Sequence, residues 1–291
     1  MAQVTRFLIL LAALLISAPK ADAYDSAYLK EVFDRYKSHV HPAILNAINS
    51  SARNKLKNVE LVYIENYKLV TLAATDVDKG EIYISSGFLN GLYQTADCLL
   101  LEGTFKVDDL CDNYFDFFLP VSIDPDETTP PFTVAQILLN FDDTKITEWT
   151  QHEATDKARK RMLFAALINV MTHEMGHHIV GGITPGMTVP QVKAIESKAD
   201  DWTYSTLSQI GQPPLLGAAV SLFYVAQWEH YRARLAAENA GNPDFRQLPS
   251  IHPRPGDRAR KAFGTTCDEE SSEPALARAC DLMRRTIARM P

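Results

Sequence analysis

The organisation of this chain depends on residues 167–182, which read Leu-Ile-Asn-Val-Met-Thr-His-Glu-Met-Gly-His-His-Ile-Val-Gly-Gly. Within them, His173-Glu174-Met175-Gly176-His177 fits the pattern H-E-x-x-H. Residues four apart on an α-helix lie on one face about a turn from each other, so the two imidazoles can bind one metal ion. Glu174 stands beside the pair, where a carboxylate can act as a general base without being a ligand. The pattern therefore predicts a helix that carries a metal ion and a base.

The residues around the motif predict that this helix is buried. Gly181-Gly182 supplies a stop at its end, and we expect it to begin near Thr155. Apolar side chains cover nearly all of its circumference: Leu163, Phe164, Leu167, Ile168, Met171 and Met175.

Composition limits the classes of function. The 291 residues are 46% hydrophobic, which is enough for one sizeable core or two small ones. The formal net charge is −7, and no basic stripe is present for a nucleic acid. We therefore exclude nucleic acid as a partner.

Residues 1–23 have the features of a secretory signal peptide. Arg6 precedes an apolar run from Phe7 to Ile16, and Ala21-Asp22-Ala23 fits the small-x-small rule, so we expect cleavage before Tyr24. An apolar run this short favours removal over a retained N-terminal anchor, which is the alternative. The mature chain, residues 24–291, is then exported, either to the periplasm or out of the cell.

The four cysteines form two local pairs in the sequence, Cys98 with Cys111 and Cys267 with Cys280. In an exported protein this favours two disulfides between these neighbours, although four cysteines permit three connectivities. A metal site made of cysteines is disfavoured, because no C-x-x-C occurs. We expect structural cross-links worth about 3 kcal/mol each.

Hydrophobic periodicity predicts the other elements. Residues 24–54 show the spacing of one or two amphipathic helices, broken near His41-Pro42, and Gly87-Phe88-Leu89 opens a short helix towards Cys98. After the motif helix we expect helices over residues 189–210, 215–240 and 273–288, with a polar loop at 250–258. A small antiparallel sheet is expected from three strands: Val59–Ile64, Leu69–Ala74 and Glu81–Ser85.

Residues 102–150 show the least pattern. They mix aspartates with Tyr114, Phe115, Phe117 and Phe118, and Pro130-Pro131 interrupts them. The spacing of the acids fits no EF-hand loop, so we interpret the segment as a surface insertion with solvated acids. A lid over the site is the alternative, because long irregular insertions are often functional.

A catalytic zinc ion takes three protein ligands and keeps a fourth position for water, so His173 and His177 need a partner. We predict Glu196, which follows His177 by nineteen positions, enough for a helix end, a turn and entry into a second helix. Asp200 lies one turn later on the same face and can accept the ring N–H of His173. Alone, these two acids would indicate a solvated helix face; the upstream motif favours the metal site.

These motifs resemble the gluzincin metallopeptidases, and more narrowly the HtpX-like and CAAX-prenyl-protease-like group. The resemblance covers roughly residues 59–98 and 160–262. Two features depart from the group: some sixty residues separate the strand and helix from the zinc helix, and membrane helices are missing. The resemblance therefore points to soluble exported members. It is carried by four motifs in the family's order: Gly80–Leu89, His173–His177, Glu196–Asp200 and His252-Pro253-x-x-x-x-Arg258.

The resemblance implies an α+β, zincin-like fold in which a small antiparallel sheet packs on the active-site helices, with one Zn²⁺ per chain. Glu174 would take a proton from the attacking water and pass it to the leaving amine. His252 and Arg258 would stabilise the oxyanion or hold the site together. The substrate would add to an exposed edge strand, formed by Glu81, Ile82, Tyr83, Ile84 and Ser85.

We therefore expect a secreted or periplasmic zinc endopeptidase. Its partner would be a polypeptide substrate, with membrane-associated polypeptides among the candidates. Two alternatives stay open: a zinc-binding chaperone or assembly factor with little turnover, and a zinc hydrolase of small amides or cell-wall peptides. Glu174 favours an enzyme, because metal binding does not need it and a base is required where it stands.

Overall fold

The computed structural model describes residues 26–107, 109–123, 142–212, 214–239 and 253–267, together with 280, 281, 284, 285, 287 and 288. This part of the chain is mostly helical with one small sheet, loosely α+β, as expected. No helix in it combines the length and the apolar character needed to cross a bilayer. The predicted signal peptide, residues 1–23, lies outside the described residues.

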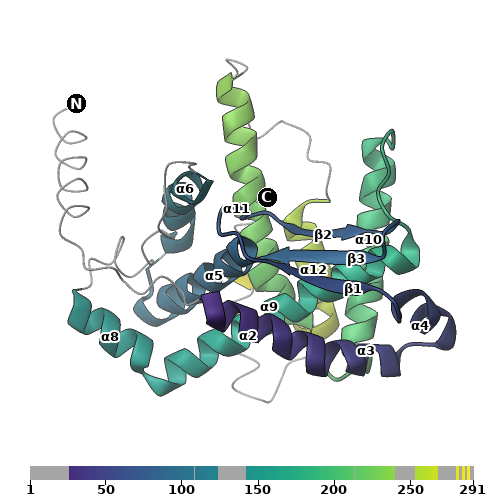
Figure 1. Ribbon diagram of the computed structural model, residues 1–291. Coiled ribbons are helices and arrows are strands. Elements are labelled where there is room, and N and C mark those ends of the chain that lie inside the picture. Colours follow the sequence, from purple (N-terminus) through teal and green to yellow (C-terminus); the bar gives the residue numbers. More distant parts are fainter. Residues whose placement is uncertain are drawn as a thin grey trace.

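The sheet has three strands in the order β1-β3-β2 (Figure 1). β1 (Glu60–Ile64) pairs with β3 (Glu81–Ser85) in parallel, whereas β2 (Ala73–Asp76) pairs with β3 antiparallel. The sheet is therefore mixed, and the prediction of an antiparallel sheet is wrong. The reason is that residues 65–72 form turns, such as Leu72 N–H to the Leu69 carbonyl at 3.2 Å, and carry the chain across to the other side of β3.

The strand order also overturns the predicted substrate edge. β3, residues Glu81–Ser85, is the central strand and has a neighbour on each side, so it cannot accept a further strand. Among the strands that the structure describes, the edges are β1 and β2. Of the two, β2 packs on the helix that carries the H-E-x-x-H motif.

The N-terminal helices follow one another with little interruption: α2 (Ser26–Arg35), the π-helix η1 (Tyr36–Val40), α3 (His41–Ala47) and α4 (Ser50–Leu56). The predicted break near His41-Pro42 is instead the start of α3, because proline fits the first turn of a helix. The Asn49 side chain caps α4 by accepting a hydrogen bond from Ala52 N–H at 2.9 Å. These helices bury Leu29, Phe33, Tyr36 and Ile44.

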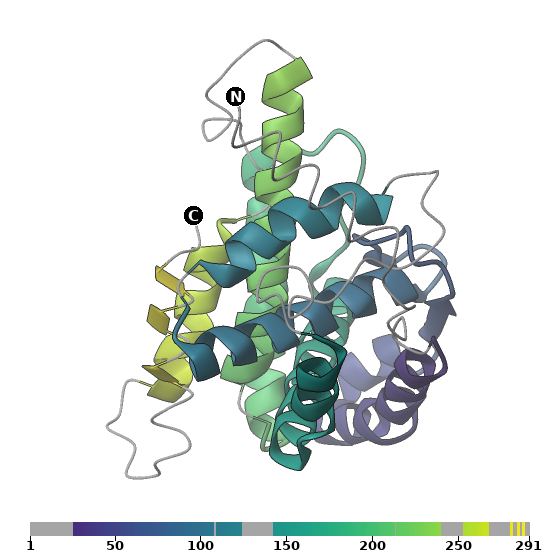
Figure 2. The ribbon, with the colours of Figure 1, turned by 90° about the vertical axis from the view of Figure 1, so that its left-hand side faces the viewer.

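The segment expected to be an irregular insertion, residues 102–150, is largely helical where it is described. α5 (Ser86–Phe105) is longer than predicted, and α6 (Leu110–Ile123) and α8 (Asp143–Gln151) follow it. In Figure 2, α5 and α6 pass side by side in front of α11 (Pro214–Asn239). Phe115 and Phe118 are buried, and the ring of Phe115 lies 5.6 Å from that of Tyr224 in α11. Tyr114, Phe115 and Phe118 therefore form core, and the interpretation as a solvated surface insertion is wrong for α6.

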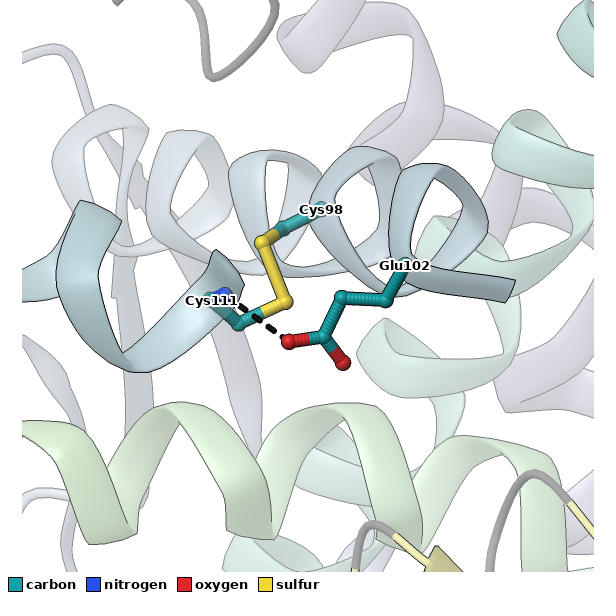
Figure 3. A group of neighbouring side chains, drawn as sticks. All are labelled: Cys98, Glu102 and Cys111. Atoms are coloured by element: carbon teal, nitrogen blue, oxygen red, sulfur yellow. Dashed lines mark hydrogen bonds between the residues drawn. A yellow bond between two sulfur atoms is a disulfide. The ribbon is translucent and has the colours of Figure 1, made fainter. Parts of the chain in front are cut away.

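A disulfide between Cys98 and Cys111 joins α5 to α6, as predicted (Figure 3). Glu102 supports the junction, because its Oε1 accepts a hydrogen bond from the backbone N–H of Cys111 at 2.9 Å. Cys280 is buried and disulfide-bonded. The side chain of its predicted partner, Cys267, is outside the described set.

α9 (Glu153–Val180), which carries the motif, lies at the centre of the molecule (Figure 1). α5, α10 (Val189–Gln209) and α11 all pack on it, and β2 and β3 contact it from the sheet side. α12 (Pro255–Cys267) packs on α10 and α11. The helices expected after the motif at 189–210 and 215–240 are confirmed, but residues 255–258 belong to α12 and not to the predicted polar loop.

Candidate metal centre

α9 brings three side chains of the motif to one buried place: His173, Glu174 and His177. The two histidines are one helical turn apart, and their ring centroids lie 4.9 Å from each other. The helix ends one turn later at Gly181, whose φ of +111° suits glycine and whose N–H still bonds to the His177 carbonyl. The motif thus occupies the last buried turns of α9.

α10 brings Glu196 and Asp200 to the same place. Both are buried, and they lie one turn apart on the face that packs against α9. The two helices meet closely at Gly176, where a Cβ atom would lie only 3.1 Å from the carbonyl oxygen of Ala199. Glycine at 176 therefore permits the approach that carries Glu196 to the two histidines.

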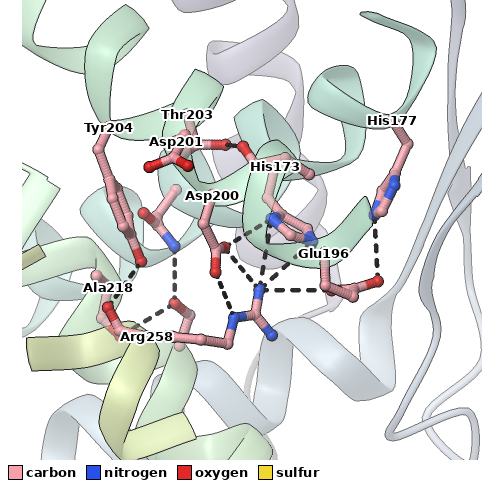
Figure 4. Close-up of polar contacts among 12 residues, drawn as sticks. His173, His177, Glu196, Asp200, Asp201, Thr203, Tyr204, Ala218 and Arg258 are labelled. Carbon is pink, nitrogen blue, oxygen red and sulfur yellow. Dashed lines mark hydrogen bonds and ion pairs between the residues drawn. The ribbon is translucent and has the colours of Figure 1, made fainter. Parts of the chain in front are cut away.

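His173, His177 and Glu196 have side-chain nitrogen and oxygen atoms that all lie within 4.8 Å of one another (Figure 4). Nε2 of His173 is 3.2 Å from Oε2 of Glu196, and Nε2 of His177 is 3.5 Å from Oε1 of the same carboxylate. Two imidazoles and a carboxylate converging in a buried site form a donor set that can hold a divalent metal ion. The three predicted ligands are thus brought together.

Asp200 and Arg258 form a second layer behind these residues (Figure 4). Oδ1 of Asp200 lies 3.0 Å from Nδ1 of His173, as predicted, so Nε2 is the ring nitrogen on the side of Glu196. Arg258 donates from Nε to Oδ2 of Asp200 and from Nη2 to Oδ1, each at 2.8 Å. Its Nη2 also lies 3.8 Å from Oε2 of Glu196. Arg258 therefore holds the two acids in place.

The charges of the site are strongly coupled. Burial alone would lower the pKa of His173, but hydrogen bonds with Asp200 and Glu196 outweigh it and raise that pKa to about 9. Burial would raise the pKa of Glu196, but the hydrogen bond from His173 and the charges of His173, Arg258 and His177 together lower it to about 2. Burial would also raise the pKa of Asp200, but the charge of Arg258 and the hydrogen bonds with His173 and Arg258 together lower it. Both carboxylates are therefore ionised near neutral pH, which favours a cation.

A cavity of about 470 Å³ opens onto this group of residues. His173, Glu174, His177, Glu196 and Arg258 all line it. On the sheet side it is lined by residues of the edge strand β2 and the segment before it: Val70, Thr71, Ala73, Ala74 and Thr75. On the other side one face of α11 contributes residues at helical spacing: Ser221, Leu222, Val225, Trp228, Glu229 and Arg232.

Sequence reasoning missed Thr75 and the α11 wall. Thr75 precedes Glu174 by 99 residues and belongs to no motif, yet its hydroxyl donates to Oε2 of Glu174 at 2.7 Å. The spacing of Leu222, Val225 and Trp228 on α11 was available in the sequence, but a core helix explains it equally well. Only the tertiary packing identifies these side chains as cavity walls.

Two further histidines of the sequence, His252 and His178, are not among the residues that the described part of the structure brings together here. His252, predicted to act on the oxyanion, lies outside the described residues. His178 follows the second ligand but is not among the residues that converge, in agreement with its position on the helix.

Comparisons with models of protein families, with curated proteins and with solved structures gave no match to this chain. The similarity to gluzincin metallopeptidases therefore stays a prediction made from the sequence.

Proposed function

We propose that the protein is a zinc-dependent endopeptidase that hydrolyses peptide bonds in polypeptides. One observation carries the proposal: Glu174 shares a cavity with the converging side chains of His173, His177 and Glu196. A site that only binds a metal does not require a further carboxylate that faces the same cavity and orients none of the ligands. A hydrolase needs one as its base.

The H-E-x-x-H arrangement of the two histidines around Glu174 supports zinc as the metal. Two imidazoles and one carboxylate are a common ligand set of catalytic zinc, which keeps a further position for water, and the cavity reaches this position. When bound there, zinc would supply a water of lowered pKa and polarise the substrate carbonyl. A cysteine-based site is disfavoured, because Cys98, Cys111 and Cys280 are all in disulfides.

Three side chains near the metal position would each have a separate role: those of Glu174, Asp200 and Arg258. Glu174 would accept a proton from the attacking water and deliver it to the leaving amine. Asp200 keeps the His173 ring in one orientation and tautomer through the contact at Nδ1. Arg258 neutralises Asp200 and fixes its two oxygens, so the ligands are held before substrate arrives.

The walls of the cavity favour an extended polypeptide as the substrate. β2 has β3 as its neighbour on one side, and among the described residues no strand pairs with the other side. A peptide added there would be held by backbone hydrogen bonds that do not depend on its sequence or on its ends. The wall formed by Leu222, Val225 and Trp228 offers apolar contact to its side chains. From the predicted signal peptide we expect hydrolysis to take place in the periplasm or outside the cell.

The test combines metal content with proteolysis. We expect the purified mature protein to contain one zinc ion per chain and to cleave unfolded casein. A chelator should abolish cleavage and added zinc should restore it. Glu174→Gln should lower the rate by about two to four orders of magnitude while one zinc stays bound, because only the base is removed.

Three other results would contradict the proposal. A Glu174→Gln variant that cleaves casein at the wild-type rate would show that Glu174 is not the base. A wild-type protein that binds zinc and unfolded casein without cleaving it would indicate a chaperone or assembly factor. Cleavage of a muropeptide assayed in parallel, without cleavage of casein, would indicate a hydrolase of cell-wall peptides.

A further inference from the structure

The carboxylate of Glu174 is attached to the sheet by a single side chain, that of Thr75 in β2. Thr75 Oγ1 lies 2.7 Å from Oε2 of Glu174 and 2.9 Å from the backbone carbonyl oxygen of the same residue. A hydroxyl has one proton to donate, and the shorter of the two contacts is the one to Oε2, so we assign the carboxylate as its acceptor. This contact links the edge strand to the motif helix at the position of the base.

The contact fixes one oxygen of the carboxylate and leaves the other to react. Among the described residues, no hydrogen bond reaches Oε1 of Glu174. A glutamate side chain has three rotatable bonds, and its terminal torsion is broad, so an unsupported carboxylate would sample several orientations in the cavity. A hydrogen bond to Oε2 limits this motion and keeps Oε1 directed away from the strand.

Thr75 is itself held by the sheet. In the register of β2 with β3 it lies opposite Ile82, which is fully buried in the core. A base positioned from a paired strand is placed more precisely than one positioned from a loop. The same strand is the edge to which we assign the substrate, so β2 would position both the base and the peptide.

We propose that Thr75 is a positioning residue that orients the general base Glu174 through its hydroxyl. This inference rests on the proposed function. It assigns Thr75 no contact with the metal and none with the reacting atoms. The hydroxyl should therefore affect turnover and leave zinc binding and substrate affinity unchanged.

The experiment compares Thr75→Val, which removes the hydroxyl and keeps the branched shape, with Thr75→Ser, which keeps the hydroxyl. We expect Thr75→Val to lower kcat on labelled unfolded casein by about tenfold to a hundredfold with KM unchanged. Thr75→Ser should recover most of the activity. Zinc content and Tm should stay at wild-type values in both. Thr104→Val, the same change at an exposed position of α5, is the matched control.

A double variant separates this inference from the proposed function. In a Glu174→Gln background, Thr75→Val should cause no further loss, because the group that it positions is already gone. If wild type cleaves, Glu174→Gln does not, and Thr75→Val retains the wild-type kcat, then the positioning role is wrong and the proposed function stands. If Glu174→Gln cleaves like wild type, the proposed function itself fails.

Other outcomes also decide against the positioning role. A Thr75→Ser variant as slow as Thr75→Val, or a Thr75→Val variant that loses zinc, would indicate that the residue serves packing only. If Thr75→Val does not fold, Thr75→Ala supplies the same loss of hydroxyl and is judged by the same criteria.

Discussion

Two buried carboxylates, those of Glu196 and Asp200, share one guanidinium, that of Arg258. Removing charges from water is costly unless they are paired, and a lone buried carboxylate would shift its pKa upwards and become neutral. Here the pKa values of both acids are lowered instead. The pairing therefore keeps Glu196 ionised as a ligand and Asp200 ionised as the acceptor for His173.

Replacing Asp200 by asparagine tests the second of these roles. Asp200→Asn should weaken zinc binding by about tenfold to a hundredfold, because a partner that orients a ligand histidine loses its charge. The measurement is a competitive zinc titration against a chelating dye. Asp201→Asn is the matched control, since Asp201 is the next residue and is exposed. Equal affinities for the two variants would contradict the assigned role.

The raised pKa of His173 predicts that zinc binding releases a proton. A pKa of about 9 lies above the ordinary value of 6.5, so the ring is protonated at pH 7 until a metal displaces the proton. Zinc affinity should therefore rise with pH until about pH 9. Calorimetric titrations at pH 7 in buffers of different ionisation enthalpy should report about one proton released per zinc. Binding without proton release would contradict the assignment.

The same shift has a consequence for the stability of the metal-free protein. A folded-state pKa above the unfolded value stabilises the fold fully below about pH 6.5, and this contribution is lost as the pH rises through about 9. The free energy of unfolding of the chelated protein, measured in urea, should therefore contain this contribution at pH 6 and have lost part of it at pH 9.

The packing of α9 against α10 sets the geometry of the ligands. Gly176 of α9 faces Ala199 of α10, which lies between Glu196 and Asp200 in the sequence. A side chain at 176 would press on the backbone of Ala199, and backbone cannot yield as the end of a flexible side chain can. The position of the third ligand therefore depends on a residue that binds nothing.

Gly176→Ala should displace α10 and weaken zinc binding by about tenfold, a change of roughly 1.4 kcal/mol. Alanine is the better helix former by about 1 kcal/mol, so helix content should not fall. Gly103→Ala in α5 is the matched control, because a Cβ atom there meets nothing within 4 Å. The control should stabilise the fold slightly and leave zinc binding unchanged. A Gly176→Ala variant with wild-type zinc affinity would refute this account of the helix contact.

The helices could be predicted where one periodic pattern dominated. α9, α10 and α11 each show apolar residues at helical spacing, and the motif places two of the three ligands on one of them. α6 was missed, because Asp112 and Asp116 are interspersed among its buried aromatic residues and the mixture resembles a loop. The order of the strands was missed, because residues 65–72 cross the sheet without any pattern of their own.

The complete site is a property of the whole molecule. Its parts come from β2, α9, α10 and α12, so Thr75 and Arg258 are 183 positions apart in a chain of 291 residues. Spacing along the sequence predicts contacts within a helix or between neighbouring helices, which is why Glu196 and Asp200 could be named. Thr75 reaches Glu174 only through the packing of the sheet on α9, and no local rule anticipates that contact.

Because the ligands converge only in the folded chain, zinc should stabilise the whole molecule. Free zinc at a hundred times its Kd would add about 2.7 kcal/mol to the free energy of unfolding. Chelation should therefore lower Tm, and restored zinc should raise it again, in scanning calorimetry. A Glu196→Gln variant should show a smaller difference between the two states. Identical Tm values for zinc-loaded and chelated wild type would contradict this expectation.

The most direct test of the metal centre is an X-ray absorption spectrum at the zinc edge of the purified protein. We predict a first shell of nitrogen and oxygen at about 2.0–2.1 Å that includes two imidazole rings, from His173 and His177, and no sulfur. The Glu196→Gln variant should lose one oxygen from this shell and keep both rings. A sulfur shell at about 2.3 Å, or a spectrum with fewer than two imidazoles, would contradict the account.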